Sequence, residues 1–168
     1  ILMSYQDRPF TKSQEDYHRL FNEEGYADDH ARGSVRDFYL AASYKQLSLQ
    51  SDIYGPYAAE HDMAYYGKNG RNDSDTNPYA LFVEAISHVA AETDLHTYDG
   101  DGDGVIDNVH IIFAGYGEEA GASADAIWSH EATFYRPYEV QGLKIDHYSC
   151  APELRGNSGN GISRIGPH

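Results

Sequence analysis

The sequence predicts an α/β or α+β domain in which helices pack on a sheet. One strong helix signal is Asn77-Pro78, where a capping residue and a first-turn proline precede apolar residues at helical spacing. One strong strand signal is Asn108 to Ala114, which stays apolar after His110 and is typical of a strand buried on both faces. Because helix and strand patterns occur within 168 residues, we expect a single domain, or part of one, with a substantial core.

Three helices are expected from capping signals and apolar spacing. The first spans about Lys12 to Asn22, where Ser13 can cap the helix and Asp16, three residues later, completes a capping box. The second begins at Ser34, with Asp37 in the matching position. The third extends from Pro78 to about Glu92, and its apolar side consists of Leu81, Phe82, Ala85, Ile86 and Val89.

The other strand candidates are short runs of partly alternating or apolar residues between turn residues. Their ranges are Ile1 to Tyr5, Gln46 to Ile53, Ala126 to His130 and Leu143 to Cys150. The second of these runs ends at Gly55-Pro56, a pair that turns the chain.

The composition excludes several classes of protein. The chain has 27 acidic and 12 basic residues, a formal charge of −15, which argues against binding to nucleic acid or to an anionic membrane surface. Its 40% hydrophobic content argues against disorder, and no apolar run approaches the roughly 20 residues of a membrane span. With Cys150 as the single cysteine, no internal disulfide can form.

The acidic surplus includes one loop with a regular pattern. Asp99, Asp101 and Asp103 occupy alternate positions, and Asp107 follows four residues later. Calcium takes six to eight oxygen ligands, and carboxylates on alternate residues of a tight loop can point at one centre. The sequence therefore predicts a calcium site in residues 99–107, with these four aspartates and the backbone carbonyl of Val105 as ligands.

This loop is of the D-x-D-x-D-G type, and it departs from an EF-hand in one respect. Gly104 stands at the sixth position, where a sharp turn is needed, and Ile106 stands at the apolar eighth position. The twelfth position is His110, in a predicted strand, where an EF-hand has a bidentate glutamate on a helix. The alternative is a solvated Asp-Gly turn, although a cation would relieve the repulsion between clustered carboxylates.

The nine histidines form no recognisable zinc motif. His130-Glu131 begins like H-E-x-x-H, but Phe134 stands where the second histidine should be, so a structural histidine at a strand end is expected. Nucleophile elbows, phosphate-binding loops and dinucleotide fingerprints are also absent from the sequence.

Several blocks together resemble the secreted bacterial zinc metalloproteases of the immune inhibitor A type. In chain order the blocks are Ile1–Phe10, Gly33–Tyr39, Ala42–Tyr44, Tyr54–Pro56, Tyr65–Gly67, Asp107–Glu118, Ile127–His130 and Tyr148–Leu154. Each block alone is weak, but their order and spacing cover nearly the whole chain.

The resemblance implies a zincin-like N-terminal subdomain with a mixed twisted sheet and a stabilising calcium ion. It implies that residues 1–168 are one N-terminal subdomain of a catalytic domain, truncated at both ends. In that family, H-E-x-x-H follows shortly after an Ile-Gly pair such as Ile165-Gly166, but this chain stops at His168. The zinc ligands and the general-base glutamate are therefore expected beyond it, and the chain alone is expected to be inactive.

The resemblance also implies a bacterial enzyme, secreted or on the cell surface, that acts on proteins or peptides. The rest of the catalytic domain would be its structural partner. In zincins, an edge strand pairs with extended substrate, and Leu143 to Cys150 is the candidate, being the last strand before the expected helix. Cys150 is then a reduced, partly buried residue.

A contrasting hypothesis is a non-catalytic, calcium-dependent module that binds carbohydrate or protein. The chain has 15 tyrosines, and tyrosine suits recognition surfaces. The tyrosines are spread through all segments, however, which fits packing in a core equally well.

Overall fold

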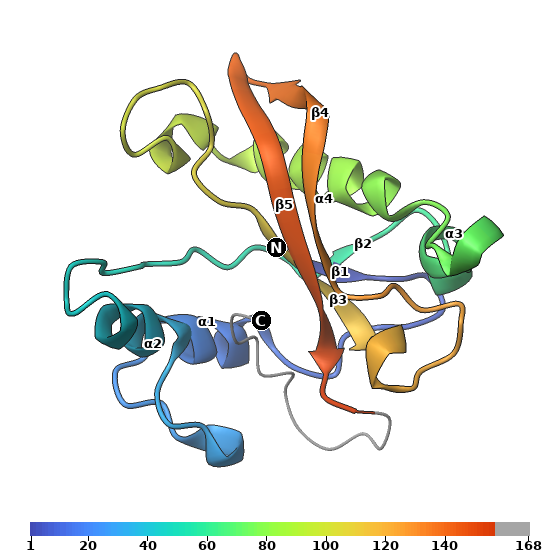
Figure 1. Ribbon diagram of the computed structural model, residues 1–168, viewed down its shortest axis with the longest axis horizontal. Coiled ribbons are helices and arrows are strands. Elements are labelled where there is room, and N and C mark those ends of the chain that lie inside the picture. Colours follow the sequence, from blue (N-terminus) through green and yellow to red (C-terminus); the bar gives the residue numbers. More distant parts are fainter. Residues whose placement is uncertain (157–168) are drawn as a thin grey trace.

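The structure, a computed structural model, describes residues 1–156, and one five-stranded sheet organises them (Figure 1). The order across the sheet is β2-β1-β3-β5-β4. All neighbouring strands are parallel except β4, which is antiparallel to β5. The strands are β1 (Leu2–Ser4), β2 (Tyr57–Ala58), β3 (His110–Tyr116), β4 (His130–Val140) and β5 (Leu143–Leu154).

The helices within residues 1–156 include all three that the sequence predicts. The α-helices are α1 (Gln14–Asn22), α2 (Val35–Ala42), α3 (Met63–Gly67) and α4 (Pro78–Glu92). The short 3₁₀ helices are η1 (Asp28–His30), η2 (Arg71–Asp73), η3 (Leu95–Tyr98) and η4 (Glu118–Ala120). No helix in this part of the chain is long and apolar enough to cross a bilayer.

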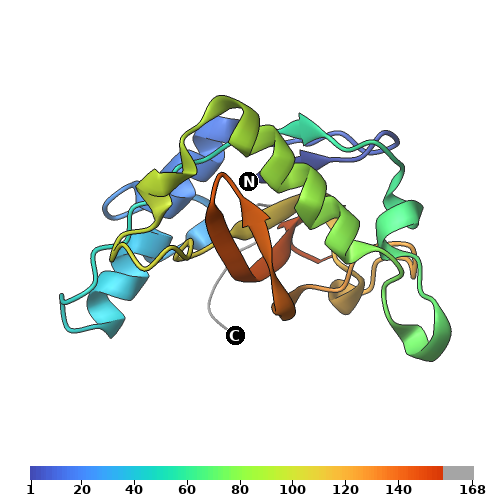
Figure 2. The same cartoon turned by 90° about the horizontal axis from the view of Figure 1, so that it is seen from above.

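The core is divided between the two faces of the sheet. On one face, Met3, Ile111 and Phe113 pack with the apolar side of α4, which lies across the sheet (Figure 2). On the other face, the alternate residues Leu2 and Ile112 pack with α1. Because β1 and β3 are covered on both faces, β3 is buried and apolar from Ile111 to Gly115, as its sequence predicts.

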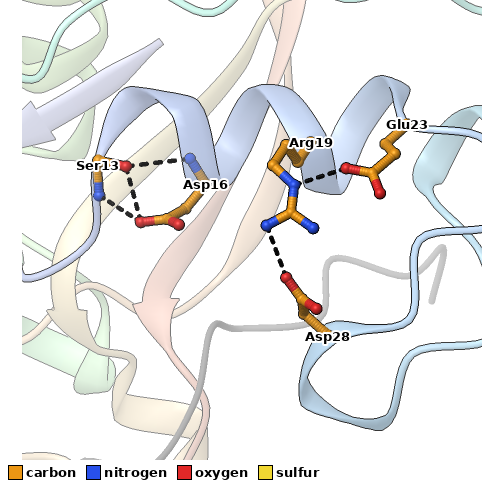
Figure 3. A network of polar contacts seen from close by, with 5 residues as sticks. All are labelled: Ser13, Asp16, Arg19, Glu23 and Asp28. Atoms are coloured by element: carbon orange, nitrogen blue, oxygen red, sulfur yellow. Dashed lines mark hydrogen bonds and ion pairs between the residues drawn. The ribbon is translucent and has the colours of Figure 1, made fainter.

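Helix α1 begins with the capping box that the sequence predicts. The side chain of Ser13 accepts a hydrogen bond from the backbone N–H of Asp16, and Oδ2 of Asp16 accepts one from the backbone N–H of Ser13 (Figure 3). At the far end, Arg19 contacts the carboxylates of both Glu23 and Asp28. The Ser13 hydrogen bonds hold the pKa of Asp16 below its usual value.

We expect Ser13→Ala to lower the free energy of unfolding by about 1 kcal/mol, because the backbone N–H of Asp16 loses its acceptor and the Asp16 carboxylate loses the Ser13 hydroxyl. Since the folded-state pKa of Asp16 is lowered, its contribution is present above its unfolded pKa and is lost as the pH falls through the folded value. Urea unfolding at pH 7 and at pH 3 measures both effects. An equal loss at the two pH values would contradict the reciprocal role of Asp16.

The predicted strand at Gln46 to Ile53 is wrong, because no strand forms there. The segment has no neighbouring strand, and side chains of α1 take up its backbone groups instead. The amide of Asn22 bonds to both the N–H and the carbonyl of Ser51, and Gln14 donates to the carbonyl of Ile53.

The predicted strand at Ala126 to His130 is also misplaced, because β4 begins at His130 and continues to Val140. Ala126 and Ile127 are buried, but as a loop packed on α3. A Cβ atom on Gly67 would lie 2.5 Å from the backbone of both residues, so glycine permits this close approach.

The predicted edge strand is corrected as well. The range Leu143 to Cys150 lies within β5, and β5 has β3 on one side and β4 on the other. A two-residue turn, Gln141-Gly142, joins β4 to β5, and β4 is an edge strand of the sheet. The loop expected from Gly156 onward, the Ile165-Gly166 pair and His168 lie beyond the described residues, apart from Gly156 itself.

Candidate metal site in the acidic loop

The acidic loop, residues 99–107, joins η3 to β3, and backbone hydrogen bonds hold it at its two ends and along residues 104–106. The backbone N–H of Asp107 donates to the carbonyl of Tyr98 at 2.9 Å, which closes the loop. Lys144 in β5 exchanges two backbone hydrogen bonds with it, to Gly104 and from Ile106, both at 2.9 Å. Ile106 is 3% exposed and sits in the main core, where the apolar eighth position of the motif was expected.

Three of the predicted ligands converge. Asp99, Asp101 and Asp103 each place one carboxylate oxygen within 4.8 Å of the others. Backbone N–H groups orient them: those of Asp103 and Gly104 donate to Asp99 at 3.0 Å, and that of Val105 donates to Asp103 at 2.8 Å. The loop therefore holds three anionic oxygen donors around one point.

Glycines permit the tight path of the loop. Gly102 and Gly104 have φ values of 75° and 85°, in the left-handed region that other residues rarely adopt. The requirement for glycine at the sixth position of the motif is thus met at Gly104.

The remaining two predicted ligands are placed differently. Asp107 is not part of the convergent group, and its Oδ2 accepts a hydrogen bond from the N–H of Gly100 at 3.0 Å. Val105 takes part through its N–H group. Coordination by Asp107 and by the Val105 carbonyl therefore stays a prediction.

The chemistry of the donor set favours one class of metal. Carboxylate oxygens suit a hard cation such as calcium, whereas zinc in proteins is bound mainly by histidine nitrogen and cysteine sulfur. Within residues 1–156, these three aspartates are the one group of three convergent histidine, cysteine or acidic side chains. The described residues consequently do not fit a zinc ion.

His130 has the structural role expected at the start of a strand. Its Nδ1 lies 2.8 Å from the carbonyl oxygen of Trp128, so this nitrogen must donate, and Nε2 accepts from the hydroxyl of Tyr148 at 2.8 Å. Both ring nitrogens are thereby used. The sulfur of Cys150, on the paired position of β5, lies 3.4 Å from Nδ1.

Cys150 is a free cysteine that is 6% exposed, and burial raises the pKa of its thiol to about 12. Because the thiolate is the reactive form, we expect almost no reaction with a disulfide reagent at pH 8 while the protein is folded. Ultraviolet absorbance of the released thiol measures the rate. Reaction should become rapid in urea, and equal rates in the two states would contradict burial of this side chain.

His110, which follows the acidic loop, does not contribute to it. Its Nδ1 lies 2.7 Å from the hydroxyl of Ser149 on β5. Burial lowers the pKa of His110 to about 3, so the imidazole is neutral at pH 7.

Glu153 is a buried anchor that the sequence pattern did not single out. It is fully buried, and its Oε1 accepts hydrogen bonds from the backbone N–H groups of Thr11 and Lys12, at 2.5 and 2.9 Å, and from the Thr11 hydroxyl. Its Oε2 accepts from the N–H of Gly115 at 3.0 Å. The carboxylate thus joins the end of β5 to β3 and to the segment before α1.

Comparison with known proteins identifies the family. Residues 3–152 match the model of the immune inhibitor A peptidase M6 catalytic domain. The chain belongs to the M6 peptidase family. The matched region begins in β1 and ends in β5, so the sheet and the acidic loop are both within the M6 domain.

Two bacterial relatives illustrate the similarity. The pre-pro-metalloprotease PrtV of Vibrio cholerae serotype O1 is 34% identical over 146 residues, which cover 74% of this chain and 16% of PrtV. Immune inhibitor A of Bacillus thuringiensis subsp. alesti is 30% identical over 154 residues, which cover 84% of this chain and 22% of that protein. The chain therefore spans a fifth or so of the length of these relatives.

Proposed function

We propose that this chain is the N-terminal part of the catalytic domain of a secreted, calcium-stabilised zinc metalloendopeptidase. The full-length protein would hydrolyse peptide bonds with zinc-activated water, and the zinc ligands would lie outside residues 1–168. The match to the M6 catalytic domain over residues 3–152 carries this proposal. The names of the PrtV and immune inhibitor A relatives support a bacterial protein outside the cytoplasm.

Residues of this chain would contribute a scaffold and a binding edge. Because β4 is at the edge of the sheet, its outer backbone groups are available to an extended peptide, which could add as a further strand. Protein or peptide substrates would therefore lie along β4, in place of the range Leu143 to Cys150.

Calcium would stabilise the contact between the acidic loop and β5, the strand that pairs with β4. The loop with Asp99, Asp101 and Asp103 bonds to Lys144 in β5, so an ion bound there would hold together η3, β3 and the beginning of β5. Its two positive charges would offset part of the formal charge of −15.

The residues that follow His168 in the complete gene test the zinc assignment. We expect an H-E-x-x-H motif within the next few codons, because the two histidines on one helical turn and the glutamate are the parts that this chain lacks. A continuation without this motif would contradict zinc-dependent hydrolysis and favour a calcium-dependent binding module or an inactive homologue of the protease. The tyrosine content does not decide between a protease and a binding module, since five tyrosines are in the core, whereas Tyr44 and Tyr135 are largely exposed.

A further inference from the structure

The β4–β5 hairpin extends beyond the other strands (Figure 1), and its outer part is weakly paired. Thr133 lies opposite His147, but Tyr138 lies opposite Ile145, so residues 134–137 of β4 bulge opposite Asp146 alone. The outer segment of β4, residues 138–140, therefore pairs with β5 over a very short stretch. A pairing this short needs support from elsewhere.

Gln141, at the tip of the hairpin, supplies such support. Its Nε2 donates to the carbonyls of Ala90 and Thr93, at 2.8 and 2.9 Å, and its Oε1 accepts from the N–H of Leu95 at 2.8 Å. These groups lie at the C-terminal end of α4 and the start of η3, where helix carbonyls lack partners within the helix. One side chain thus fastens the tip to an element about 50 residues away in sequence.

The conformation of Gln141 supports a specific role for its side chain. Gln141 and Gly142 have φ values of 51° and 82°, the pattern of a two-residue hairpin turn that favours asparagine, aspartate or glycine at both positions. Glutamine is less suited to this backbone, but it is one methylene longer than asparagine. The longer side chain lets the amide bond to α4.

We propose that Gln141 is a positioning residue that holds the outer segment of β4 in line for pairing with extended peptide substrate. This inference rests on the proposed function, because it requires peptides to bind along β4. Without the Gln141 hydrogen bonds, the outer segment would be held only by its three pairs with β5 and by the packing of Tyr138 and Val140 on the core. It would then move more relative to residues 130–133, and a peptide that spans both segments would have to order it on binding.

The matched test compares Gln141→Asn with Gln50→Asn in the full-length protein. Asparagine suits the turn and keeps the amide, but its side chain is too short to reach α4. Gln50 is exposed, and within the described residues it makes no side-chain hydrogen bond, so its variant controls for the shortened amide. The substrates are one unfolded peptide of about ten residues, long enough to span β4, and one of about four residues.

We expect Gln141→Asn to raise KM for the long peptide about fivefold, the scale of one lost hydrogen bond, with kcat unchanged. KM for the short peptide should stay as in the wild type, and amide exchange should accelerate at Val140 and Lys144. Gln50→Asn should change none of these values.

Two results would overturn the inference and leave the proposed function intact. One is unchanged amide exchange at Val140 and Lys144 in Gln141→Asn. The other is faster exchange with the same change in KM for the long and the short peptide, which would indicate a general loss of order in the protein. Absence of peptide hydrolysis by the wild-type full-length protein would instead contradict the proposed function, and the inference with it.

Discussion

Glu153→Gln is expected to lower the free energy of unfolding by about 2–4 kcal/mol, although it removes no packing volume. The wild-type carboxylate accepts four hydrogen bonds, three at Oε1 and one at Oε2, and all four donors are N–H or O–H groups. A glutamine amide has one acceptor and one donor end. Whichever way it is oriented, an NH₂ group must face a donor from Gly115 or from Thr11 and Lys12.

Urea unfolding of the 168-residue chain measures this loss, with Glu131→Gln as the matched control. Glu131 is exposed on β4 and has no side-chain partner among the described residues, so its substitution should change the free energy by less than about 0.5 kcal/mol. A Glu153→Gln variant as stable as this control would show that the carboxylate is not needed to join β5, β3 and the segment before α1.

Calcium is expected to stabilise the protein by about 2.7 kcal/mol when its concentration is 100-fold above the dissociation constant, because only the folded loop brings the ligands together. Thermal unfolding with and without a calcium chelator measures this effect. Asp101→Asn should abolish most of the response, since it removes one of three convergent charges while keeping an oxygen that accepts from Asp103.

Without calcium, the effect of Asp101→Asn on stability should be the opposite, which separates loss of metal binding from a general loss of stability. In chelator, Asp101→Asn should be at least as stable as the wild type, because repulsion between the three carboxylates is reduced. Glu92→Gln, an exposed change at the end of α4, is the control and should leave the calcium response unchanged. A calcium response that survives in Asp101→Asn would contradict the loop as the binding site.

The sequence predicted the elements that carry strong local signals. Capping residues Ser13 and Ser34 set the beginnings of α1 and α2, and the apolar pattern after Pro78 defined α4. The acidic pattern was likewise sufficient to identify Asp99, Asp101 and Asp103 as convergent candidate ligands, because the spacing of the aspartates and the glycines at positive φ are both local features.

Elements that depend on distant partners were missed. The edge position of β4 depends on the Gln141-Gly142 turn, which lacks the strong Asn-Gly signal, and on a bulge that contains Pro137. The segment Gln46 to Ile53 has strand-like composition, but side chains of α1 bond to its backbone. Whether a segment pairs as a strand therefore depends on tertiary contacts, which the periodicity of the sequence does not reveal.

The buried anchor Glu153 also could not be found from local pattern. Its neighbours Pro152 and Leu154 read as the end of a strand, and a glutamate there suggests an exposed face. The N–H groups that compensate for burying this carboxylate belong to residues far away in sequence, among them Thr11 and Gly115. A buried carboxylate is tolerated only because those donors converge on it.

Hydrolysis of an unfolded protein such as casein by the full-length protein, before and after zinc removal, tests most directly whether this chain is part of a zinc endopeptidase. We expect cleavage that stops when a zinc chelator is added and returns when zinc is restored, and no cleavage by residues 1–168 alone with zinc present. Cleavage by residues 1–168 alone, or full-length activity that persists after zinc is removed, would contradict the proposal.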